Sequence, residues 1–200
     1  MSTSGNKNLF IIFVPGLGGN HLANIISLDQ QYQTRFYLDG YKDIKDSENA
    51  HFSTVRNLEL DSIKNNLDSL IGKNNVFCSH LAQYQWFAES EYSKYFENKQ
   101  FICISMPSTN ARPQQRLQRY HGLLKNEYFF QELNMLYSLK YLSLIFDEHD
   151  WFLTSADLLF NDDINELLDN LSEQGLNLSL DRDLAQNLHT QWINNIIKGN

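Results

Sequence analysis

Residues 9–26, LFIIFVPGLGGNHLANII, decide the fold of this 200-residue chain. The stretch opens with LFIIFV, a short run of β-branched and aromatic residues that is typical of a fully buried strand. Pro15 and Gly16 end the run, and from Asn20 onward the apolar residues recur at helical spacing, with Asn20 as the expected N-cap. The pattern therefore predicts a strand, a glycine-rich turn and a helix.

Strand-like and helix-like segments alternate along the rest of the chain. We expect strands at 34–39, 75–80, 100–105 and 150–155, and helices around 60–71, 82–97, 113–123, 126–146, 164–175 and 184–196. Such alternation favours a parallel α/β sheet flanked by helices on both faces. The chain has no internal repeat, low-complexity segment or linker, so we expect a single domain over residues 1–200.

The composition narrows the choice of partners. Hydrophobic residues make up 42% of the chain, as in folded globular proteins, and the net charge is -8. Affinity for a nucleic-acid backbone depends on clustered Lys and Arg, so this balance argues against nucleic acid as a partner. A local basic pocket remains compatible with an acidic chain.

Cysteine usage and hydropathy point to a reducing compartment. Cys78 and Cys103 both lie inside apolar runs and have no second Cys or His at metal-ligand spacing, so we expect buried thiols and no metal site. The apolar run at 9–14 is too short to span a membrane and lacks a signal-peptide cleavage pattern. We therefore expect a cytoplasmic protein with no membrane partner.

The glycine turn has two possible uses. In a wound parallel sheet, ligands bind beyond the carboxyl ends of the strands, where helix N-termini attract anions. Gly16, Gly18 and Gly19 would let the backbone curl around a phosphate, with amides from Gly18 to His21 pointing inward. The alternative is a strand-to-helix turn that binds nothing. The loop alone leaves both interpretations open.

Two standard glycine motifs do not fit. The Walker A pattern needs a Lys and a hydroxyl residue that this loop lacks, and the dinucleotide fingerprint needs a final glycine where GLGGNH has His21.

An α/β-hydrolase is a minor alternative, because Ser79, Asp157 and His189 follow the chain order of that fold. Phe77 and Leu81 flank Ser79 where a nucleophile turn needs small residues, which argues against it. Asp157 is better interpreted as a helix cap.

Four stretches together resemble the sulfotransferase-type members of the P-loop fold, namely PGLGGNHL (15–22), FCSHL (77–81), ICISMPS (102–108) and WFLTSADLLFNDDINELLDNL (151–171). The resemblance implies a three-layer P-loop-type sheet whose first loop binds 3′-phosphoadenosine-5′-phosphosulfate without a metal. It implies that the donor contacts Pro15, Gly16, Leu17, Gly18, Gly19, Asn20 and His21. It also implies that His80 acts as base toward the acceptor hydroxyl, a role for which the near-neutral reference pKa of histidine is suited.

The chain departs from the family pattern at the groups that bind the donor. Gly16 stands in place of the loop lysine, Gly19 and Asn20 replace two hydroxyl residues, and Ser105 stands where the family has an arginine. Arg112, Arg116 or Arg119 is expected to supply a cation from another direction. A protonated His21 at the start of the helix is a further candidate donor.

Three functions are compatible with these residues. The first is transfer of a sulfuryl group from the phosphosulfate donor to a hydroxyl or amine of a small molecule or saccharide. The second is a related transferase that uses another phosphate donor, for which a requirement for magnesium is typical. The third is a non-catalytic protein that binds a nucleotide, a glycan or a protein through the same cleft, as loss of the lysine suggests.

Overall fold

The computed structural model describes residues 6–32, 60–107, 109–121, 137, 141 and 151–198. Four strands form one parallel sheet in the order β2-β1-β3-β4. The strands are β1 (Asn8–Ile12), β2 (Asn75–Ser79), β3 (Lys99–Ser105) and β4 (Trp151–Ser155). The expected parallel α/β sheet is thereby confirmed.

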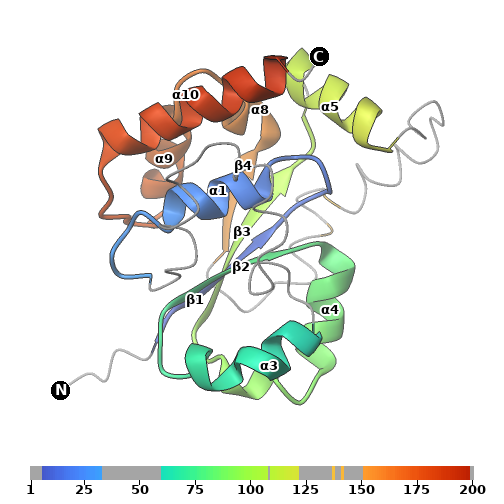
Figure 1. Cartoon of the computed structure of the whole chain (residues 1–200), viewed down its shortest axis with the longest axis vertical. Helices are drawn as coiled ribbons and strands as arrows, with labels where there is room; N and C mark the ends of the chain where they lie inside the picture. Colours follow the sequence, from blue (N-terminus) through green and yellow to red (C-terminus); the bar gives the residue numbers. More distant parts are fainter. Residues whose placement is uncertain are drawn as a thin grey trace.

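Helices cover both faces of this sheet. They are α1 (Gly19–Ile26), α3 (Leu60–Leu70), α4 (Leu81–Glu89), the 3₁₀-helix η4 (Ser93–Tyr95), α5 (Ala111–His121), α8 (Ala156–Leu159), α9 (Ile164–Glu173) and α10 (Arg182–Lys198). Figure 1 shows α1, α9 and α10 on one side of the strands and α3 and α4 on the other. The result is a three-layer arrangement. No helix in the described part of the chain combines the length and apolar character needed to cross a membrane.

Three expected elements differ from the structure or lie outside the residues that it describes. The strand expected at 34–39 lies outside the described residues, as does nearly all of the helix expected at 126–146. The helix expected over 82–97 is shorter, since α4 ends at Glu89 and η4 is separate. Ser90 explains the break: its hydroxyl donates to the Phe87 carbonyl (2.6 Å) and accepts from the Tyr92 amide (3.3 Å), so it competes with helical bonding.

A row of aromatic side chains builds the face under α4. Phe10 on β1 is in register with Phe77 on β2 and Phe101 on β3, at ring separations of 5.0 and 5.6 Å. Tyr84 and Phe87 of α4 pack on this row, both with rings 5.5 Å from Phe10. These α4 aromatics therefore belong to the core.

Asparagine amides close the amino-terminal edge of the sheet. The Asn75 amide nitrogen lies 2.9 Å from the Asn8 side-chain oxygen, 3.1 Å from the Leu70 carbonyl and 3.0 Å from the Lys73 carbonyl. The Asn8 amide in turn donates to the Glu97 carbonyl at 2.6 Å. Both asparagines are buried. Backbone groups at this edge are thus satisfied by short side chains close to them.

The opposite edge of the sheet is formed by the carboxyl ends of the strands, where ligands bind in sheets of this kind. The chain moves from β1 to one neighbour, β2, whereas it moves from β3 in the other direction to β4. In open α/β sheets ligands bind outside the carboxyl ends of the strands at such a reversal. The loop of residues 13–18, called the glycine loop below, leaves β1 at this point, and Ser105 ends β3 beside it.

Candidate functional site

The glycine loop connects β1 to the N-terminus of α1. Gly18 is the N-cap, with φ 75° and ψ 16° in the left-handed region, and no side chain caps the helix. The expectation of Asn20 as N-cap is wrong, because a left-handed glycine already turns the chain and α1 begins at Gly19. Helix N-termini carry amides without intrahelical partners and a partial positive charge, so this end of α1 favours an anion.

Gly18 in the loop and Gly19 at the start of α1 also have a packing reason to be glycine. A Cβ on Gly19 would lie 2.1 Å from the Phe13 ring, and one on Gly18 would lie 2.9 Å from Trp192 and 3.2 Å from Leu159. Aromatic rings therefore occupy the space that larger side chains would need. The glycines alone do not distinguish a phosphate cradle from a tightly packed turn.

His80 follows β2 and bonds to the start of the glycine loop. Its Nδ1 lies 3.0 Å from the Phe13 carbonyl oxygen, and the two rings meet edge to face at 4.9 Å. A carbonyl only accepts, so Nδ1 carries the proton and Nε2 is the acceptor nitrogen. This is the tautomer that a general base needs.

Tyr137 reaches the same carbonyl. Its hydroxyl donates to the Phe13 oxygen at 3.1 Å and accepts from the Leu81 amide at 3.3 Å. Burial raises the pKa of Tyr137 to about 12, so the phenol stays protonated. Sequence reasoning missed this residue, since its contact with Phe13 spans 124 residues and leaves no local pattern.

Arg116, on α5, brings a cation to the other end of the glycine loop. Its Nε donates to the Gly16 carbonyl at 2.9 Å, and its guanidinium lies 5.9 Å from the centre of the Trp192 ring. The charge thus stands beside Gly16, the position that the resemblance aligns with a loop lysine. This is the arrangement expected if an arginine supplies the cation from another direction.

Arg112, one turn earlier on α5, bonds to the segment that follows α8 and not to the glycine loop. It donates to Asp162 at 2.6 Å and to the Phe160 carbonyl at 3.2 Å. This hydrogen bond holds the pKa of the Asp162 carboxyl below its usual range. Arg112 therefore anchors α5, and its expected contact with a donor phosphate stays a prediction.

The remaining candidates at the strand ends have structural partners. Ser105 pairs with Ser155 across β3 and β4, and Ser155 is the N-cap of α8, accepting from the Leu158 amide. Asp157 accepts from the Asn110 amide at 2.9 Å. The Asp157 carboxylate therefore caps the chain entering α5 and not its own helix.

His21 bonds to the C-terminal helix. Its Nε2 lies 3.0 Å from His189 Nδ1, and His189 Nε2 lies 2.7 Å from the Asn161 carbonyl. The carbonyl fixes His189 Nε2 as a donor and His189 Nδ1 as the acceptor of the His21 proton. Burial lowers the pKa of both histidines, that of His21 well below its usual value. The lowered pKa values favour neutral imidazoles, and His21 is directed at α10. That a protonated His21 binds the donor stays a prediction.

The hydrolase triad does not assemble. Ser79 donates to the His80 carbonyl and His189 bonds to His21 and Asn161. β2, which carries Ser79, and β4, which precedes Asp157, are the two outer strands of the sheet. Three strand spacings of about 4.8 Å separate them by roughly 14 Å.

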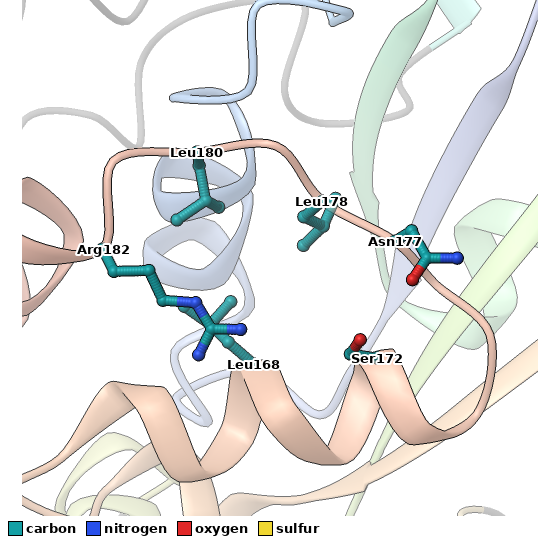
Figure 2. A pocket seen from close by; sticks show the side chains of 6 residues that line it. All are labelled: Leu168, Ser172, Asn177, Leu178, Leu180 and Arg182. Atoms are coloured by element: carbon teal, nitrogen blue, oxygen red, sulfur yellow. The ribbon is translucent and has the colours of Figure 1, made fainter.

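One small cavity lies elsewhere, between α9 and the segment 176–182 (Figure 2). Its volume is about 40 Å³, and it is lined by Leu168, Ser172, Asn177, Leu178, Leu180 and Arg182. A space of this size suits ordered water and not a substrate. Within the described ranges, no three His, Cys, Asp or Glu side chains are grouped as metal ligands would be.

Comparison with known proteins gives no assignment, because no family model matches the chain and no curated protein matches its sequence. The resemblance to sulfotransferases stays a prediction.

Proposed function

We propose that the glycine loop binds 3′-phosphoadenosine-5′-phosphosulfate and that the protein transfers the sulfuryl group to a hydroxyl of a small molecule or saccharide. One observation supports this more than any other: a base and a cation bond to carbonyls of the same loop. His80 contacts Phe13, and Arg116 contacts Gly16.

Each group has a role in the proposed transfer. The donor supplies an activated sulfur atom, and the acceptor oxygen attacks it in line as the bond to the phosphate oxygen breaks. His80 Nε2 takes the hydroxyl proton. The amides at the start of α1 and the Arg116 guanidinium stabilise the charge that develops on the leaving phosphate.

A second candidate is binding without catalysis. Trp192 packs directly on Gly18, and the loop has Gly16 in place of lysine. Both features favour a protein that keeps the anion site and has lost the transfer step. A transferase that uses a nucleoside triphosphate instead would require magnesium.

Calorimetric titration with adenosine 3′,5′-bisphosphate, the spent donor, tests the proposal without knowledge of the acceptor. We expect micromolar binding that weakens about tenfold in Arg116→Ala, as loss of one charge-assisted contact implies. Arg182→Ala is the matched control, since Arg182 pairs with Asp169 and contacts none of the loop residues named above.

The outcomes separate the candidates. Stronger binding of ATP with magnesium would favour the other transferase, and binding of neither nucleotide would overturn both donor-dependent functions. Binding without turnover on any hydroxyl acceptor would favour the second candidate. In an active enzyme, His80→Gln should keep nucleotide affinity and lose turnover.

A further inference from the structure

Trp192 of α10 lies where four separate parts of the chain meet at the glycine loop. Its indole stacks on His21 at 4.0 Å and 6°, and meets Phe160 edge to face at 5.0 Å. Two indole carbons lie 2.9 Å from where a Cβ of Gly18 would be, and Arg116 lies over the ring at 5.9 Å. No motif and no proposed catalytic role accounts for this residue.

The turn of residues 160–164 sets the position of α10. The Gln186 amide donates to the Asp162 carbonyl at 2.8 Å and its oxygen accepts from the Ile164 amide at 3.0 Å. His189 bonds to Asn161 in the same turn. These contacts place the next turn of α10, which carries Trp192, against the loop.

The same turn also sets the position of α5. Arg112 bonds to Phe160 and Asp162, and Arg116 follows one helical turn later. Residues four apart lie on the same face of a helix. The indole and the guanidinium are therefore brought to the loop from two helices that share one anchor.

We propose that Trp192 is a positioning residue of this site, which holds the Arg116 guanidinium against Gly16 and fixes the backbone at Gly18. An arginine side chain loses much rotamer freedom when it is held in one place. The Gly16 carbonyl fixes one edge of the guanidinium, and the indole offers the aromatic surface that attracts a cation most strongly. The use of that cation on a donor phosphate rests on the proposed function.

The first test needs no ligand. The exchange rate of the Arg116 Nε proton with water, measured by NMR, reports directly on the bond to Gly16. We expect exchange at least tenfold faster in Trp192→Leu and an intermediate rate in Trp192→Phe, which keeps a smaller ring. Trp86→Leu is the control, since Trp86 is 64% exposed on α4 and should leave the rate unchanged.

The signal is assigned by its loss in Arg116→Ala, and thermal melting shows which variants are folded. An unchanged rate in folded Trp192→Leu would overturn the proposal. If that variant does not fold, Trp192→Phe decides the question, because an unchanged rate there together with unchanged nucleotide affinity would contradict the role.

The second test is a double-mutant cycle with adenosine 3′,5′-bisphosphate. Trp192→Leu should weaken binding about tenfold in the natural background and less than twofold when Arg116→Ala is also present. Additive effects would show that Trp192 does not act through Arg116. Failure of the natural protein to bind would overturn the proposed function alone, and the proton exchange rate would still decide the role of Trp192.

Discussion

The two edges of the sheet satisfy backbone carbonyls in different ways. At the amino-terminal edge, the amide of Asn75 contacts the Leu70 and Lys73 carbonyls. At the carboxyl edge, the carbonyls of the glycine loop bond to an imidazole, a phenol and a guanidinium. An amide carries no charge, whereas a guanidinium is charged and an imidazole can bind or release a proton near neutral pH. The five residues of β1 thus separate an edge with uncharged side chains from one that carries groups suited to chemistry.

The largest effect is expected at the carboxyl edge, from Gly19→Ala. The new Cβ would overlap the Phe13 ring, which is buried and packs against His80. We expect the free energy of unfolding to fall by about 3 kcal/mol or more, measured by urea denaturation. Adding Phe13→Leu should restore part of the loss. Full stability of the single variant would show that the ring does not pack on Gly19.

The next largest effect is expected at the amino-terminal edge, from Asn75→Ala. Three oxygen atoms lose their contact with this amide, and an unpaired buried polar group costs about 1–3 kcal/mol. We expect the free energy of unfolding to fall by about 2 kcal/mol while affinity for adenosine 3′,5′-bisphosphate stays unchanged. A folded variant with weaker nucleotide binding would contradict the separation of the two edges.

Acid should lower the free energy of unfolding through two histidines near the carboxyl edge, His21 and His189. Burial lowers the pKa of His21 and His189, so the unfolded chain binds more protons than the folded one below pH 6.5. The stability that depends on these two neutral histidines is therefore fully present above pH 6.5. It is lost as the pH falls, by up to about 1.4 kcal/mol per pH unit for each histidine. Asp162 and Asp163 beside His189 oppose the shift there, and Arg112 adds to it.

Urea denaturation at pH 7.5 and 5.5 measures this loss, for which we expect about 1.5 kcal/mol. A His21→Gln, His189→Gln double variant should show a flatter dependence. An identical slope in that variant would assign the acid sensitivity to other groups.

The smallest effect is expected from Arg112→Ala. Its partner Asp162 is exposed, and exposed ion pairs contribute less than about 1 kcal/mol. Arg182→Ala, which removes the exposed pair with Asp169, should behave alike in urea denaturation. A loss above about 2 kcal/mol in Arg112→Ala alone would show that the anchor of α5 is stronger than its exposure implies.

Local patterns predicted most of the described sheet. The strands expected at 75–80, 100–105 and 150–155 match β2, β3 and β4 to within a residue, because short apolar runs bounded by turns reflect burial on both faces. The pattern failed where one side chain decided the outcome. Ser90 ended α4 early, and Gly18 took the N-cap role expected of Asn20.

The sequence alone identified only some residues of the candidate site. His80 and Arg116, both singled out from the sequence, bond to the loop, because each belongs to an element that ends or begins at the carboxyl edge. Their roles stay predictions. Trp192 was missed, and His189 was considered only as part of a hydrolase triad. The spacing of Trp192 is that of any core residue of α10, and no local pattern distinguishes a core aromatic from one that packs on a loop far away in sequence.

The contact between His21 and His189 joins positions 168 residues apart, which has a consequence for biosynthesis. At about 5–20 residues per second, a ribosome needs roughly 8 to 34 seconds to go from one to the other. Throughout that interval the nascent chain holds β1 and the glycine loop without the indole that packs on Gly18 and His21. Chaperones that bind apolar segments would therefore meet the N-terminal part of this protein before its own last helix does.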